Sequence, residues 1–196
     1  GDLPQECQGN LATETCTDVE VGRIEEIFER IAGDLAMIAD REFTISSIET
    51  ERMDSRPAGE GSIHISFKLG FQTGDGMMHG CLLIPLGDAI CLASYLMMVA
   101  DDQVEQKRGE TTLDSTTKDA MLEVGNFVAG ATDAGLRALG VEGVQVGSEG
   151  CQGVKPDVRP ALVYSEGSPL FVGRAKATLH AFDEFEMLLI LPDLGQ

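Results

Sequence analysis

Apolar residues recur along this chain with two different periods, and each period predicts one kind of element. Over residues 19–40 the spacing is three or four, as on the buried face of a helix; the apolar positions are Ile24, Ile27, Phe28, Ile31, Leu35 and Ile38. A second long helix is predicted over residues 115–139. Thr116 and Asp119 offer a capping box at its start, and Gly140 is a natural stop.

Strict alternation of apolar and polar residues predicts strands. It appears over residues 62–71, where the Gly74-Asp75-Gly76 turn then leads into a returning strand over residues 77–86. A short strand is expected at residues 43–48 and a final hairpin at residues 169–178 and 185–191. Weaker strand candidates are residues 144–146, 154–158 and 161–164, and two further segments read as a short apolar helix (87–99) and a charged connector (101–112).

These elements form two similar sets. Glu26-x-x-Glu29-x-x-Ala32-Gly33 in the first long helix matches Glu123-x-x-Asn126-x-x-Ala129-Gly130 in the second, and CLLIPLGD (81–88) matches MLLILPDL (187–194). The simplest account is a duplicated unit, although short amphipathic elements can also match by coincidence. We therefore predict an α+β fold with pseudo-twofold symmetry, in which two long helices pack on a largely antiparallel sheet. Residues 1–18 read as a loose lead-in, and residues 19–196 as a single domain.

The charge of the chain narrows the class of partner, and its cysteines and apolar runs indicate its location. The 196 residues include 33 acidic and 14 basic ones, and the net charge of −19 disfavours nucleic acid and anionic membranes. The longest apolar run, residues 89–100, is too short to span a bilayer, and the first 20 residues do not resemble a signal peptide. The five cysteines form no CxxC pair, which favours free thiols and a cytoplasmic location.

The second long helix carries the candidate chemistry. At about 100° per residue, one polar stripe contains Asp119, Glu123, Asn126, Gly130, Asp133 and Arg137. Asparagine is unfavourable inside a helix, because its side chain competes for backbone hydrogen bonds, and Asn126 is too far from either end to act as a cap. No nucleophilic side chain accompanies it on this stripe.

The segment Asp119-Ala-Met-Leu-Glu123-Val-Gly-Asn126 resembles the D/S-x-x-x-E-x-x-N motif of the CheC, CheX and FliY chemotaxis phosphatases, and the similarity extends over most of residues 20–194. This resemblance implies a phosphatase that hydrolyses the phospho-aspartate of a CheY-type response regulator. Asn126 would position the attacking water, Glu123 would pair with a lysine of the receiver domain, and Asp119 would support the motif. No cofactor of its own is implied, because the Mg²⁺ is expected in the receiver's acidic pocket.

The first long helix carries a degenerate copy of the motif. Glu26 stands at the position of the motif's acid, but Glu29 replaces the asparagine. The chain therefore resembles CheX-like members, which keep a single site and which dimerise, so a homodimer is an open expectation. The first proline after Asn126 is Pro156, farther away than in the CheC pattern, which implies an insertion near residues 140–153.

Two alternatives remain beside the phosphatase. Flagellar switch proteins resemble the same fold without the motif, so a non-catalytic binding or scaffold module is the main one. A metal-dependent hydrolase is disfavoured, since no His, Cys or acidic cluster has metal-ligand spacing. His64, His79 and His180 are isolated along the sequence and are expected to have structural roles.

Overall fold

The computed structural model describes residues 15–165 and 167–195. Residues 1–14 of the predicted lead-in (1–18) lie outside these ranges. The elements in chain order are α1 (Asp18–Ala39), β1 (Phe43–Met53), β2 (His64–Thr73), β3 (Gly76–Pro85), α2 (Leu86–Leu96), α3 (Asp101–Lys107), α4 (Ser115–Ala138), β4 (Gln145–Val154), β5 (Leu170–Leu179) and β6 (Phe185–Pro192).

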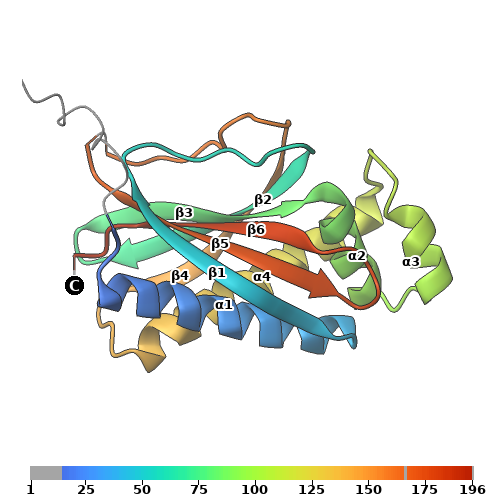
Figure 1. Ribbon diagram of the computed structural model, residues 1–196, viewed down its shortest axis with the longest axis horizontal. Coiled ribbons are helices and arrows are strands. Elements are labelled where there is room, and N and C mark those ends of the chain that lie inside the picture. The colour runs from blue at the N-terminus through green and yellow to red at the C-terminus, as the bar shows by residue number, and fades with distance from the viewer. Residues whose placement is uncertain (1–14, 166, 196) are drawn as a thin grey trace, which may run out of the picture.

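The six strands form one antiparallel sheet in the order β1-β5-β6-β3-β2-β4. The long helices α1 and α4 lie beside each other on one face of it (Figure 1). They approach closely where Gly135 of α4 faces α1, because a Cβ at that glycine would lie 3.2 Å from the side chain of Ile27. The predicted α+β architecture is confirmed.

Both long helices begin with a side-chain cap. In α1 the Thr17 hydroxyl accepts a hydrogen bond from the Glu20 amide, and the Glu20 carboxylate accepts one from the Thr17 amide at 2.7 Å. In α4 the cap is Asp114, whose Oδ1 accepts from the Thr117 amide at 2.7 Å. The predicted capping box of Thr116 and Asp119 is therefore wrong, because both residues already lie within the helix.

Helix α4 ends in a turn that contains Gly140 in the left-handed conformation. Gly140 has φ +77°, its amide donates to the Arg137 carbonyl, and the Val141 amide donates to the Leu136 carbonyl. This pair of hydrogen bonds, with the left-handed residue between them, is a Schellman motif. The predicted stop at Gly140 is confirmed.

The centre of the sheet reveals the internal symmetry. Leu82 of β3 lies opposite Leu189 of β6 in an antiparallel pair, so a pseudo-twofold axis between them relates residues 81–85 to residues 188–192. Both leucines belong to the core on the helix side, whereas Leu188 belongs to the smaller core on the other face. The predicted match of 81–88 with 187–194 is thus wrong by one residue, because such a shift places every side chain on the opposite face.

Each half gives its outer strand to the other half. β1 follows α1 in the chain but pairs with β5, and β4 follows α4 but pairs with β2. The helices follow the same exchange, since α1 lies against β5 and α4 lies against β2.

Three segments differ from the prediction. The expected connector at residues 101–112 contains the helix α3, in which Val104 is completely buried. Asp101 holds this helix in place, because its Oδ1 accepts a hydrogen bond from the Tyr95 hydroxyl at 2.7 Å and another from Nε of Arg41 at 3.0 Å. Residues 145–154, where fragments and an insertion were expected, form the continuous edge strand β4, and Pro156 lies in the loop just beyond it. Residues 161–164 do not form a strand.

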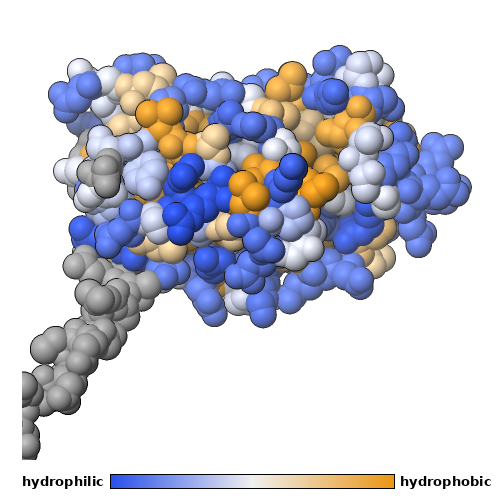
Figure 2. Space-filling view, turned by 90° about the horizontal axis from the view of Figure 1, so that it is seen from above, coloured by the Kyte–Doolittle hydropathy of each residue, from blue (hydrophilic) through white to orange (hydrophobic). Residues whose placement is uncertain are grey.

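The second face of the sheet is covered by two loops. The loop after β1 and residues 155–165 run across it (Figure 1), joined by a hydrogen bond from the Asp157 amide to the Gly59 carbonyl at 2.9 Å. Under them lies the smaller core of Cys81, Leu83, Leu170, Val172, Leu188 and Ile190. Figure 2 looks onto this face, where small groups of apolar residues lie among hydrophilic ones. No helix in the described ranges is long and apolar enough to cross a membrane.

Candidate functional site

The polar stripe of α4 faces away from the protein core. Asp119, Glu123, Asn126 and Gly130 are exposed, while Met121, Val124 and Val128 on the opposite side of the helix are completely buried. The helix is held in place by this apolar side, so its polar residues are presented on a rigid element. We call the exposed segment from Asp119 to Gly130 the α4 ridge.

Glu123 and Asn126 interact within the ridge. Nδ2 of Asn126 donates a hydrogen bond to Oε1 of Glu123 at 3.2 Å. This contact orients the amide and uses only one of its two N–H groups. The amide oxygen, the second N–H and the other carboxylate oxygen of Glu123 remain available to an incoming molecule.

The two ends of the ridge differ. Asp119 lies one turn before Glu123 and is exposed. Gly130 lies one turn after Asn126, and a Cβ built there would meet no atom within 4 Å. A partner surface can therefore approach the helix backbone closely at that end.

The stripe predicted from the sequence is longer than the ridge. Oδ1 of Asp133 accepts from the Val146 amide of β4 at 2.9 Å, and Oδ2 pairs with Nε of Arg137 at 2.8 Å. Asp133 thus attaches the edge strand to the helix, so its role is structural. Leu122 was not predicted as part of the site, although its side chain is 44% exposed beside Glu123. A leucine next to the polar stripe was the available signal.

The degenerate copy on α1 is also placed on an exposed face. The caps Thr17 and Asp114 each lie nine positions before the acid of their motif copy, which supports the predicted register. Glu29 is exposed, but Glu26 is held by Nε of Arg30 at 2.8 Å. In this register Gly22 stands where α4 has Asp119, so α1 lacks a second motif residue besides the asparagine.

The predicted isolated residues are distributed through the fold. His64 is buried with its Nδ1 2.9 Å from the Ser62 carbonyl, Nδ1 of His79 lies 3.3 Å from Glu149, and His180 packs edge-on against Tyr95. Cys16, Cys81, Cys91 and Cys151 are free thiols, whereas Cys7 lies outside the described residues. Within residues 15–165 and 167–195, no three His, Cys, Asp or Glu side chains gather as metal ligands would.

Known structures share this fold, whereas the comparisons by sequence find no match. No family model and no curated protein matches the chain. FliY of Thermotoga maritima is similar with 14% identity and a TM-score of 0.63, covering 92% of this chain and 93% of its own. The chemotaxis protein CheX of Desulfovibrio desulfuricans has 14% identity and a TM-score of 0.52, covering 86% and 96%. A chain of the FliG–FliM complex of H. pylori has 11% identity and a TM-score of 0.60, covering 91% and 94%.

These similarities establish a fold common to chemotaxis proteins of the CheC, CheX and FliY type and to FliM, and at such low identity they establish the fold alone.

Proposed function

We propose that this protein accelerates hydrolysis of the phospho-aspartate of a CheY-type receiver domain in chemotaxis or related two-component signalling. The observation that carries the proposal is the exposed, hydrogen-bonded pair of Asn126 and Glu123 on the α4 ridge. The ridge inserts into the receiver's phosphorylation site, and this chain supplies the amide that positions the water.

The reaction suits a site without a nucleophile or a general acid. The water oxygen attacks phosphorus, the bond from phosphorus to the aspartyl oxygen breaks, and inorganic phosphate and a free carboxylate result. The leaving carboxylate has a pKa of about 4 and needs no proton from the enzyme. What phosphoryl transfer requires is positioning and neutralisation of charge. The receiver's own acidic pocket is expected to hold the Mg²⁺ that neutralises the phosphoryl oxygens.

Asn126 has the chemistry needed to position water. A carboxamide both donates and accepts hydrogen bonds, and it carries no charge that would repel the phosphoryl oxygens. Its bond to Glu123 restricts its rotation before the receiver arrives. Glu123 has a second oxygen available, which is suited to a lysine on the receiver.

The shape of the ridge suits a protein substrate. A helix carries Asn126 outward, so the amide can enter a pocket on another molecule, whereas a concave site would exclude a folded receiver. The exposed Leu122 offers an apolar contact beside Glu123, and Gly130 leaves room for the partner's backbone. We infer that the docking surface extends along these turns of α4.

A binding or scaffold function is the second candidate. The observation in its favour is that the TM-score with the FliG–FliM chain (0.60) exceeds that with CheX (0.52). A scaffold would bind a receiver or a flagellar switch protein through the same face without accelerating dephosphorylation.

Phosphate release from a panel of phosphorylated receivers of the same source separates the two functions. The phosphatase proposal expects substoichiometric protein to accelerate release from at least one receiver over its own autodephosphorylation. Binding of a phosphorylated receiver with no change in its dephosphorylation rate would support the scaffold instead.

A further inference from the structure

A second candidate site lies on the face of the sheet opposite α4. Below residues 161–163 is a cavity of about 420 Å³, lined by Arg56, Lys68, His79, Gly80, Glu149, Ala161, Leu162 and Val163. It lies beneath the segment that follows β4, so its residues are independent of the α4 ridge.

The charge in this cavity is unusual for such an acidic chain. Acidic residues outnumber basic ones by 33 to 14, yet Arg56 and Lys68 line the same cavity, and no carboxylate of the described chain lies within ion-pair distance of either. Glu149 is the one acidic residue in the lining, and it lies 3.3 Å from His79. Within the described residues, neither cation is thus neutralised by an ion pair with a carboxylate.

One nitrogen of the Arg56 guanidinium makes a hydrogen bond, and another has no hydrogen-bond partner. Its Nη1 donates to the Pro160 carbonyl at 2.7 Å, which fixes the guanidinium under the covering segment. Its Nε is buried and has no hydrogen-bond partner in the described residues. Proteins rarely leave a buried charged donor unpaired, because the lost hydration is not replaced.

Arg56 and Lys68 also act electrostatically on the same buried thiol. Burial raises the pKa of the Cys81 thiol to about 12, and the charges of Lys68 and Arg56 both act on the same thiol in the opposite direction. The two cations therefore both lie within electrostatic reach of Cys81, and they line one cavity although they come from different segments, the loop after β1 and strand β2.

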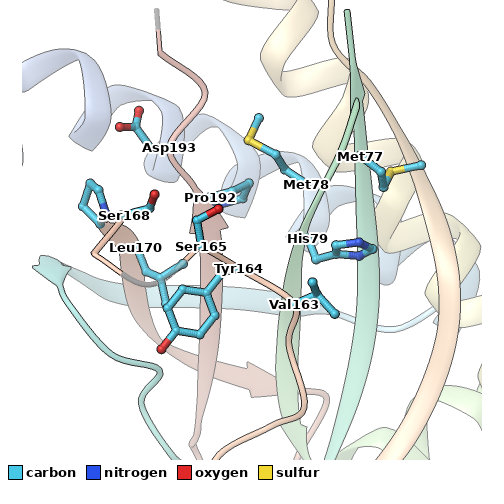
Figure 3. A pocket seen from close by; sticks show the side chains of 11 residues that line it. Met77, Met78, His79, Val163, Tyr164, Ser165, Ser168, Leu170, Pro192 and Asp193 are labelled. Carbon is cyan, nitrogen blue, oxygen red and sulfur yellow. The ribbon is translucent and has the colours of Figure 1, made fainter. Parts of the chain in front are cut away.

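The rest of the lining is apolar. Ala161, Leu162 and Val163 cover the cavity, and across His79 and Val163 it adjoins a second cavity of about 290 Å³ (Figure 3). Met77, Met78, Tyr164 and Leu170 line that second space. An anion bound here would thus have a charged end near the cations and an apolar body beside the covering segment.

We propose that this cavity binds a small organic oxyanion, a carboxylate or phosphate monoester, with its charged end between Arg56 and Lys68. The guanidinium fork and the ammonium group supply charge-assisted donors, and residues 161–163 contact the apolar body.

Benzoate, phenyl phosphate and neutral benzyl alcohol are suitable probes, titrated into the full chain and followed by amide chemical shifts. Both anions should produce saturable shifts centred on Gly80, Leu162 and Val163, and binding should weaken as salt is added. The tighter of the two anions assigns the headgroup. Benzyl alcohol should bind at least about tenfold more weakly, the effect of losing one charge-assisted contact.

Lys68→Gln is the cleaner variant, because Arg56 also holds Pro160. It should weaken the affinity for the anions about tenfold, and Lys68→Arg should restore most of it. Lys176→Gln removes an exposed lysine from another strand, β5, and should leave affinity unchanged. Equal binding of benzyl alcohol and the anions, unaltered affinity in Lys68→Gln, or shifts elsewhere on the protein would each overturn the proposal.

Discussion

Phe28 of α1 packs directly over Gly173 of β5. A Cβ at Gly173 would lie 2.6 Å from the Phe28 ring and 2.5 Å from the Ile24 side chain. In the other half of the molecule the roles are exchanged, because the helix position equivalent to Phe28 is Gly125 and the strand position equivalent to Gly173 is Phe67. One aromatic ring thus fills each helix–sheet gap, from the helix in one half and from the sheet in the other.

Gly173→Ala should therefore destabilise the protein. The added methyl group has no room against Ile24 and Phe28, and overpacking of this kind costs about 1–3 kcal/mol. Urea unfolding gives the free energy directly. Gly125→Ala is the matched control, because its Cβ would lie 3.3 Å from the Ser148 hydroxyl and 3.4 Å from Phe67, farther than the contacts at Gly173, and alanine favours the helix by about 1 kcal/mol. Equal losses in the two variants would contradict the exchange of ring and glycine.

Asn126→Ala should reduce the acceleration of receiver dephosphorylation by about 100-fold or more, since the attacking water loses its position. The fold should persist because the side chain is exposed. Phosphate release measures the rate, and circular dichroism checks the fold. Arg137→Ala, about 16 Å farther along the helix at 1.5 Å per residue, should retain activity. Full activity in Asn126→Ala would remove the proposed role of this residue.

Glu123 is expected to have two separable roles. Glu123→Gln keeps an acceptor for Asn126 but removes the charge, so it should raise KM and reduce its dependence on salt while changing kcat little. Glu123→Ala removes both functions and should also lower kcat. Steady-state kinetics at two ionic strengths tests this. If Glu123→Gln lowers kcat as much as Glu123→Ala does, the charge itself serves the chemical step.

The degenerate copy of the motif on α1 should recover part of the phosphatase activity when its missing asparagine is supplied. In an Asn126→Ala background, Glu29→Asn supplies the missing amide and removes a carboxylate that would repel the phosphoryl oxygens. Arg30 holds Glu26, so adding Arg30→Ala should increase the recovery. Phosphate release should exceed the Asn126→Ala background several-fold in the triple variant. A rate no higher than that background would show that α1 is related to α4 in fold only.

The pairing of α3 predicts a dependence of stability on pH. Hydrogen bonds from Tyr95 and Arg41 lower the pKa of the Asp101 carboxyl below its ordinary value. In the unfolded chain the Asp101 carboxyl has its ordinary pKa of about 4, so as the pH falls it is protonated there before it is protonated in the folded protein. The stabilisation is present above that pH and is lost as the pH falls through the folded-state pKa.

Asp101→Asn should accordingly be less stable than the natural chain at pH 7, and the difference should shrink below about pH 4. Urea midpoints measured from pH 3 to pH 7 provide the comparison. A difference that stays constant down to pH 3 would mean that the carboxylate charge contributes nothing to holding α3.

The long periodic elements could be read from the sequence, because the apolar residues along one face of each belong to the main core. Ile24 to Leu35 in α1 and the alternating residues of β2 are examples. α3 could not, since only Val104 of that helix is buried and its place depends on the distant Arg41. β4 lies at the edge of the sheet and contains Gly147, Gly150 and Gly153, which have low strand propensity. The segment is a strand because it pairs with β2, and that pairing could not be seen in the sequence.

The exposed Glu123 and Asn126 of the α4 ridge could be singled out in the sequence for the opposite reason. Asn126 contradicts local helix propensity, and that contradiction is visible in the sequence without any structure. The cavity lined by Arg56 and Lys68 could not be predicted, because the two residues come from separate segments and share no spacing. Their meeting depends on how the covering segment crosses the sheet, which only tertiary structure determines.

The exchange of β1 and β4 means that neither half of this chain is complete by itself. A fragment ending before α4 would leave the open side of β2 without β4 and β1 without β5, and the remaining fragment would have the converse gaps. The two fragments should reassemble when mixed, since each supplies what the other lacks. A single half could pair its open strand edges only with a second copy of the same unit, as the two halves of this chain pair with each other.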